Sequence, residues 1–121
     1  MTSGDGPRLP DYITHMRDAI RRIERYVADL DEPAFLADEK TQDAVIRNLE
    51  IIGEAASNIR SRYPEFVANH PDLPFGAAYG MRNALAHGYF KVDLGIVWRT
   101  IRNELPPLNA QLERLIEQGR R

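Results

Sequence analysis

The sequence predicts an all-α protein, folded as an up-and-down bundle of four to five helices. The long segments of the chain carry apolar residues at three- and four-residue spacing, which is the period of a helix that buries one face. Prolines stand between these segments and mark their ends. No segment is predicted to be a strand. Helices of this kind, joined by short connections, favour antiparallel packing in a bundle.

The first helix is expected over Pro10–Leu30. Proline suits the first turn of a helix, because its missing N–H would have no partner there anyway. The next residues, 31–40, contain a proline and are expected to form a loop. Phe35 and Leu36 are the apolar residues that would attach this loop to the core.

The second helix is expected over Thr41–Arg62, and Pro64 should stop it. Its central apolar stripe is flanked by Ile46, Ile51 and Gly53, so its apolar surface is wider than the usual arc of about 100°. A helix with one buried face does not need these flanking residues. We therefore expect it to pack against its own bundle and against a second subunit.

The second half of the chain is expected to contain shorter helices. Residues 64–74 carry three prolines and predict an irregular connection. A third helix is expected over Phe75–His87, and a fourth over Asp93–Leu105 with its first residue as the N-cap. Residues 106–107 are both proline and should break the fourth helix, so that a short fifth helix follows.

Composition limits the classes of protein that remain. The 121 residues suffice for one domain, expected over 9–118 after a disordered tail at 1–8. There is no cysteine, hence no disulfide, and the polar start of the chain is no signal peptide. No apolar run reaches the ~20 residues needed to cross a membrane. These features predict a cytoplasmic protein. A net charge of −2 argues against a nucleic-acid coat protein but permits one local basic groove.

A basic stripe accompanies the apolar stripe of the first helix. Arg17, Arg21 and Arg25 are four residues apart and share one face. The stripe is either an ordinary solvated surface or a wall that faces RNA phosphates.

One segment near the end of the third helix concentrates groups that can act on a phosphodiester. Arg82 offers a fork of donors to phosphate oxygens, and the His87 imidazole can give or take a proton near neutral pH. Asn83 lies one turn before His87 and can orient its ring. Tyr89 can stack on a base. Metal-site motifs are absent and the three histidines lack ligand spacing, so neither metal nor cofactor is expected.

The spacing of these residues leaves two interpretations open. On an ideal helix, Arg82 and His87 point about 140° apart with ~7.5 Å of rise between them. Either the arginine side chain wraps toward the imidazole, or a second subunit completes the site across a two-fold axis. Alternatively, the pair has no catalytic role: a histidine is favoured at a helix C-terminus, and the arginine could form a salt bridge.

The segment resembles the Arg-x4-His-x-Tyr signature of the HepT-type HEPN proteins, here Arg82 to Tyr89. The flanking sequence is similar as well, in order and spacing. The similar blocks are Ala44–Ala55, Tyr63-Pro64, Gly80–Asn83, His87–Phe90, Val92-Asp93 and Val97-Trp98. Family members often have tryptophan shortly before Gly-Met-Arg, where this chain has Leu-Pro-Phe ending at Phe75.

The resemblance implies a dimeric HEPN-like bundle that acts as a metal-independent endoribonuclease toxin. Its cognate antitoxin would be a minimal nucleotidyltransferase (MNT), which in some systems adenylylates the signature tyrosine. Carried over to this chain, Arg82 and His87 would be catalytic, Asn83 supporting, and Tyr89 the site of AMPylation. The alternative is a non-catalytic module that binds a nucleotide or a partner and regulates a nucleotidyltransferase.

Overall fold

The computed structural model describes residues 8–75 and 93–119, and every regular element within these two ranges is helical. The elements are α1 (Leu9–Val27), α2 (Glu32–Leu36), α3 (Glu39–Arg62), α4 (Pro64–Asn69), α6 (Leu94–Arg99), the π-helical η1 (Thr100–Glu104) and α7 (Leu105–Gly119). The predicted all-α class is confirmed. Of the helix expected over Phe75–His87, all residues after Phe75 lie outside the described ranges.

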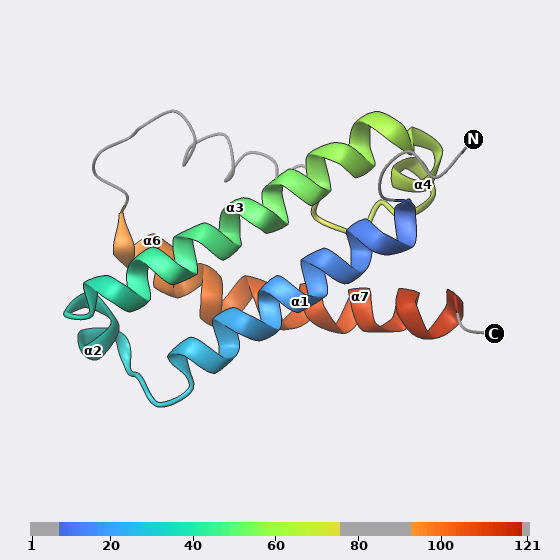
Figure 1. Ribbon diagram of the computed structural model, residues 1–121. Coiled ribbons are helices and arrows are strands. Elements are labelled where there is room, and N and C mark those ends of the chain that lie inside the picture. The colour runs from blue at the N-terminus through green and yellow to red at the C-terminus, as the bar shows by residue number, and fades with distance from the viewer. Residues whose placement is uncertain (1–7, 76–92, 120–121) are drawn as a thin grey trace.

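Three long helices form the body of the described chain. α1 packs along α3 on one side and along α7 on the other, and the short α2 and α4 lie at opposite ends of α3 (Figure 1). α6 lies beside α2. The bundle therefore has one end formed by α2 and α6, and another formed by α4 and the start of α1.

The core is built from the apolar stripes that the sequence predicted. On α1, Met16, Ile20 and Ile23 are fully buried; they meet Ile59 from α3 and Leu112 from α7 in one continuous cluster. Within this single chain Gly53 is also buried, and Ile51 packs against the core. The extra width of the apolar surface of α3 is thus largely used inside the chain and does not by itself require a second subunit.

Capping aspartates set where α2 and α3 begin, and they correct two expected boundaries. Asp31 Oδ1 accepts a hydrogen bond from the Ala34 N–H at 2.9 Å, so residues 32–36 form a helix and not a loop. Asp38 caps α3, which begins two residues before the expected Thr41. The Thr41 hydroxyl and N–H both donate to Asp38, and these bonds lower the pKa of its carboxyl.

Phe35 of α2 is fully buried, as expected, whereas Leu36 is 44% exposed and does not attach this segment to the core. One turn of helix explains the difference, because neighbouring residues on a helix point to different faces. The aromatic side chain anchors α2 to the bundle, and Gln42 Nε2 of α3 donates to the Phe35 carbonyl at 2.9 Å.

Pro64 ends α3 as predicted, but it also starts the next helix. It occupies the first turn of α4, where a proline needs no hydrogen-bond partner for its nitrogen. The expected irregular connection is therefore helical over residues 64–69 and irregular only afterwards.

The expected break at Pro106 and Pro107 is also wrong, since α6, η1 and α7 follow one another without interruption. At the junction the Leu105 N–H donates to the Thr100 carbonyl, five residues back, which is a π-helical turn. The next two residues, both proline, follow directly after this turn at the second and third positions of α7. A widened turn, and not a chain break, accommodates the two prolines.

A polar contact joins α1 to α3 inside this otherwise apolar interface. The Arg22 Nε–H donates to Asn48 Oδ1 at 2.7 Å, and Asn48 Nδ2 donates to the Ala44 carbonyl at 2.9 Å. Asn48 is only 5% exposed. Because a buried amide needs partners for both its ends, this pair fixes the register of the two helices.

We expect Asn48→Ala to destabilise the fold by about 1–3 kcal/mol, because it leaves the partly buried Arg22 Nε–H without an acceptor. Urea unfolding measures the change. Asn58→Ala is the matched control: Asn58 also donates to a carbonyl four residues back on α3, that of Glu54, but at an exposed position. Equal losses for the two variants would contradict the role given to Arg22.

Candidate active site

The four signature residues Arg82, Asn83, His87 and Tyr89 lie outside the described residues. The structure does describe the two stretches of chain that lead into and out of this segment. Residues 69–75 precede it and Asp93 with α6 follows it. The arrangement of these flanks determines how the segment joins the bundle.

The preceding flank is anchored by two apolar side chains. Leu73 is buried, and Phe75 is 2% exposed with its ring 6.1 Å from that of Phe66 on α4. The Phe75 N–H donates to the Leu73 carbonyl at 2.9 Å, which holds the two residues in a tight turn. Phe75 thus occupies a core position.

The following flank is anchored by a cap and by an aromatic pair. Asp93 Oδ1 accepts from the N–H groups of Gly95 and Ile96 at 2.9 and 3.2 Å, so the predicted N-cap is confirmed. One turn later, Trp98 is buried with its ring 5.3 Å from that of Phe35. The guanidinium of Arg102 lies 5.6 Å from the Trp98 ring.

The first flank begins at α4, at one end of α3, and the second lies beside α2, at the other end of α3 (Figure 1). Phe75 contacts α4, next to the C-terminal end of α3, whereas α6 contacts α2, next to the N-terminal end of α3. The 24 residues of α3 extend over about 36 Å. The chain that carries the signature is therefore attached to the core at both of its ends.

The basic stripe of α1 is partly neutralised by α7. Arg17 is 17% exposed in its side chain and hydrogen-bonds Asp18 at 3.0 and 3.1 Å, while its Nε lies 3.6 Å from Glu113. Arg21 Nη2 lies 3.0 Å from each carboxylate oxygen of Glu113. Arg25 is exposed in the last turn of α1. Sequence reasoning could not foresee Glu113 as partner, because it lies 92 residues from Arg21.

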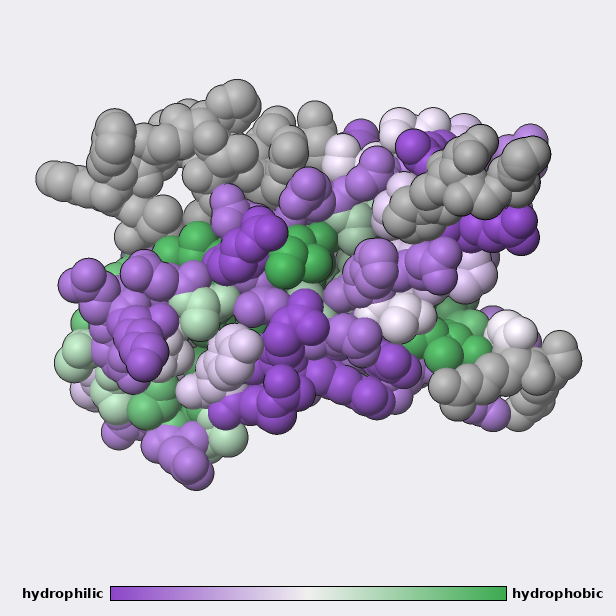
Figure 2. All heavy atoms as spheres, viewed as in Figure 1, coloured by the Kyte–Doolittle hydropathy of each residue, from purple (hydrophilic) through white to green (hydrophobic). Residues whose placement is uncertain are grey.

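Hydrophilic side chains dominate the surface around this stripe in the view of Figure 2. An apolar area appears at the end of the molecule where α1 begins and α7 ends, and it corresponds to a hollow lined by residues such as Leu9, Ile13 and Ile116. Among the described helices, none has the length and apolarity that crossing a bilayer requires.

Neither histidine in the described ranges belongs to a group of side chains that could hold a metal ion. His15 is exposed on α1, with its ring edge-on to that of Tyr12. His70 bonds the Phe66 carbonyl and stacks on the Phe66 ring. Within residues 8–75 and 93–119, no three histidine or acidic side chains come close enough to hold a metal ion.

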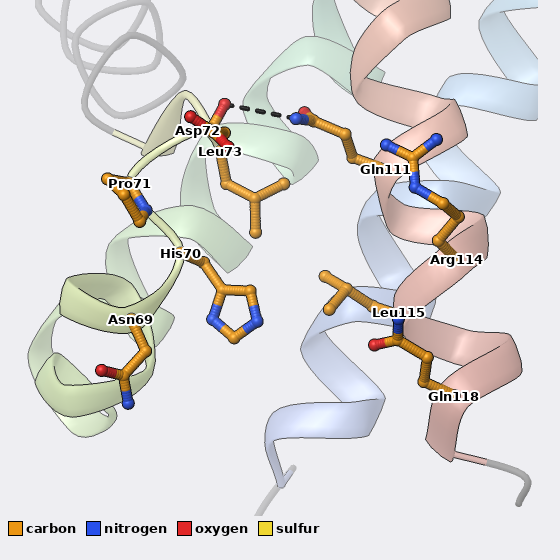
Figure 3. A pocket seen from close by; sticks show the side chains of 9 residues that line it. All are labelled: Asn69, His70, Pro71, Asp72, Leu73, Gln111, Arg114, Leu115 and Gln118. Atoms are coloured by element: carbon orange, nitrogen blue, oxygen red, sulfur yellow. Dashed lines mark hydrogen bonds between the residues drawn. The ribbon is translucent and has the colours of Figure 1, made fainter.

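Sequence reasoning missed one polar cavity, which opens between residues 69–73 and α7 (Figure 3). A signal for it exists in the sequence: Gln111, Arg114 and Gln118 recur at helical spacing and form a polar face of α7. This face was not distinguished from an ordinary solvated surface.

The chain matches the family model described as "Ribonuclease HepT-like" over residues 16–115. It is 41% identical to a probable ribonuclease HepT of Thermococcus cleftensis over 105 residues, which cover 87% of this chain and 93% of that protein. It is 33% identical to a putative RNase of Caldanaerobacter subterraneus over 107 residues, 88% of this chain and 93% of that protein.

A third relative places the same domain in a longer protein. Over 107 residues the chain is 36% identical to a protein of Methanocaldococcus jannaschii named as a gamma-glutamylcyclotransferase and putative RNase, covering 88% of this chain but 47% of that protein. No solved structure matches the chain significantly. The family match spans most of the bundle, and the chain therefore belongs to the HepT-like ribonuclease family, with the helical fold that its sequence predicted.

Proposed function

We propose that this protein is a metal-independent endoribonuclease and the toxin of a HEPN/MNT toxin–antitoxin module. The observation that supports this proposal most directly is the family match over residues 16–115. That range contains the whole Arg-x4-His-x-Tyr sequence, Arg82 to Tyr89. RNA in the cytoplasm is the proposed substrate.

In the proposed reaction the 2′-OH of the RNA attacks the adjacent phosphorus atom. A base removes the 2′-OH proton, the bond to the 5′-oxygen breaks, and that oxygen receives a proton, which leaves a 2′,3′-cyclic phosphate and a 5′-OH. His87 transfers a proton in this sequence. Arg82 stabilises the charge that develops on the phosphorane oxygens, and Asn83 orients the imidazole or the substrate.

The proposed active form is a homodimer. The apolar width of α3 does not require a second subunit, since Gly53 and Ile51 are used within one chain. The spacing of Arg82 and His87 favours a dimer, because an ideal helix points these two residues about 140° apart. A two-fold axis would bring the arginine of one subunit near the histidine of its partner, because an isologous interface uses the same surface twice.

The cognate nucleotidyltransferase is proposed to inhibit the enzyme by AMPylation of Tyr89. This residue is two positions from His87 and directly follows a glycine. An adenylate on its oxygen would place a bulky anion beside the catalytic pair. That anion would compete with an RNA phosphate for Arg82 and repel it by like charge.

The first test is RNA cleavage by the purified protein and by His87→Ala. We expect the variant to remain folded and to lose activity by about 10²–10⁴-fold, since that is the usual contribution of a general acid or base. Arg82→Lys should also be impaired, because an ammonium cannot reproduce the bidentate fork. His15→Ala is the control, since it removes an exposed imidazole of the described chain. Cleavage by His87→Ala at the wild-type rate would refute the assignment and favour a non-catalytic module.

The second test concerns the basic stripe of α1. Glu113→Gln removes the carboxylate that pairs with Arg17 and Arg21, so we expect tighter RNA binding and a steeper dependence of affinity on salt. Stability should change by no more than about 1 kcal/mol, as is usual for exposed ion pairs. Glu65→Gln on α4 is the charge-matched control. If both variants bind RNA equally, the stripe is only a solvated surface.

The third test uses coexpression with the minimal nucleotidyltransferase that is proposed as its antitoxin. Intact-mass and peptide analysis should find one or more adenylate groups on Tyr89, together with loss of RNA cleavage. Tyr89→Phe should escape modification, whereas Tyr26→Phe, which changes a tyrosine exposed on α1, should not. A fully inhibited complex with an unmodified Tyr89 would show that the antitoxin blocks the site sterically.

A further inference from the structure

A polar cavity of about 230 Å³ opens at the end of the bundle opposite α2, between residues 69–73 and α7 (Figure 3). Its lining comprises Asn69, His70, Pro71, Asp72, Leu73, Gln111, Arg114, Leu115 and Gln118. None of the roles proposed above uses these residues. The proposed ribonuclease function therefore assigns no role to this cavity.

Both walls of the cavity have a fixed shape. One wall is a face of α7, an unbroken helix. The other is the loop after α4, which is held by the buried side chain of Leu73 and by the Leu73 N–H, which donates to the His70 carbonyl at 3.1 Å. Gln111 Nε2 on α7 also donates a hydrogen bond to the Asp72 carbonyl on the opposite wall, at 3.3 Å. A preformed site of this kind loses little entropy when it binds a ligand.

His70 presents a defined ring edge to the cavity. Its Nδ1 lies 2.9 Å from the Phe66 carbonyl, which can only accept, so Nδ1 carries the proton. Its ring also stacks on that of Phe66, with centroids 4.2 Å apart. The other nitrogen, Nε2, faces across the cavity toward α7 and is an acceptor in the neutral imidazole (Figure 3).

Opposite charges stand on the two walls. Arg114 is exposed on α7, and no ion pair or hydrogen bond ties it to the rest of the described chain. Asp72, from the loop, lines the opposite wall. The Asp72 carboxylate would repel a free phosphate ion, and the Arg114 guanidinium would repel a free cation. The pair suits a neutral ligand that offers acceptors along one edge and donors along another.

Among the RNA bases, guanine has this arrangement. Its O6 and N7 are adjacent acceptors that match the fork of an arginine, and its N1–H and N2–H₂ groups donate. Adenine places a donor beside N7 and would direct it at the guanidinium. The volume is below the ~300 Å³ at which sites for larger ligands begin, so it suits one base and not a folded oligonucleotide. Leu73 and Leu115 supply apolar surface for the faces of the ring.

We propose that this cavity binds one unpaired guanine base of RNA. Arg114 donates to O6 and N7, while Asp72 and His70 Nε2 accept from the N1–H and N2–H₂ groups. Proteins read single-stranded RNA by such splayed-out bases. The proposal relies on the proposed function only in naming RNA as the source of the base, and it makes the cavity a specificity subsite for guanine.

The test is a titration of the wild-type protein with GMP, AMP, CMP, UMP and inorganic phosphate, followed by the imidazole NMR signals of His70. None of these probes contains a phosphodiester that the enzyme could cleave. We expect GMP to bind most tightly and to shift the His70 signals, and phosphate alone to leave them unchanged. Equal binding of all four nucleotides, a response to phosphate alone, or unchanged His70 signals with GMP would each overturn the proposal.

Two variants and a control locate the contacts. Arg114→Ala should weaken GMP binding about tenfold or more, the usual value of a bidentate arginine–guanine pair. Asp72→Asn should reduce the preference for GMP over AMP; its backbone carbonyl, which Gln111 bonds, stays in place. Arg47→Ala removes an exposed arginine near the other end of α3 and should leave GMP binding unchanged. Equal losses from Arg114→Ala and Arg47→Ala would indicate only general attraction of the phosphate and refute the base site.

These experiments test the guanine site separately from the proposed ribonuclease activity. GMP binding without any RNA cleavage would support the cavity and count against the ribonuclease. Cleavage that proceeds equally well next to every base, with wild-type and Arg114→Ala protein alike, would support the ribonuclease and refute the guanine subsite.

Discussion

The apolar face of α1 lies between α3 and α7, and this burial supports the other contacts of the described chain. Met16, Ile20 and Ile23 have no exposed surface, so one helix provides the centre of the core for both of its neighbours. A fully buried aliphatic side chain contributes roughly 1.5–3 kcal/mol, so this interface contributes strongly to the stability of the described chain. The hydrogen bond between Arg22 and Asn48 sets the register of the two helices, because it fixes which turn of α1 contacts which turn of α3.

The positions of the two flanks of the signature segment follow from the packing of these helices. Once α1 and α3 are paired, α2 and α4 occupy opposite ends of α3, and they carry the aromatic side chains that hold the two flanks. The ring of Phe66 packs against that of Phe75, and the ring of Phe35 packs against that of Trp98. The two described flanks of the signature segment are therefore both packed against the helical bundle. The cavity beside His70 lies against the preceding flank, since Leu73 belongs to both.

Periodicity predicted the long helices and most of the core, because a buried helical face leaves a pattern in the sequence that needs no knowledge of its partner. Proline is the less reliable signal. Pro64 does end α3, but the prolines at 33, 64 and 106–107 also lie in the first turn of a helix, where the sequence predicted a loop, an irregular connection and a break; Asp31 is the capping signal that points to the first of these helices. The π-helical turn at Thr100 left no pattern to recognise.

Long-range polar contacts could not be predicted from one sequence. The pairing of Arg21 with Glu113 and of Arg22 with Asn48 depends on how the helices meet, and either arginine could equally have been solvated. The polar face of α7 was visible in the sequence, but only the loop after α4 turns it into a cavity. The signature itself was recognised through resemblance, since Arg82 and His87 alone would also fit an ordinary helix end.

We propose that His87 and Arg82 cleave RNA by 2′-OH attack without a metal ion. The chemistry of the product ends tests this mechanism, after a defined single-stranded RNA is incubated with the purified protein in EDTA. We expect cleavage under these conditions, with 2′,3′-cyclic phosphate and 5′-OH ends, because an imidazole and a guanidinium suffice for this route. Cleavage that appears only after magnesium is added and leaves 3′-OH and 5′-phosphate ends would contradict it, because a metal-activated water would then be the nucleophile.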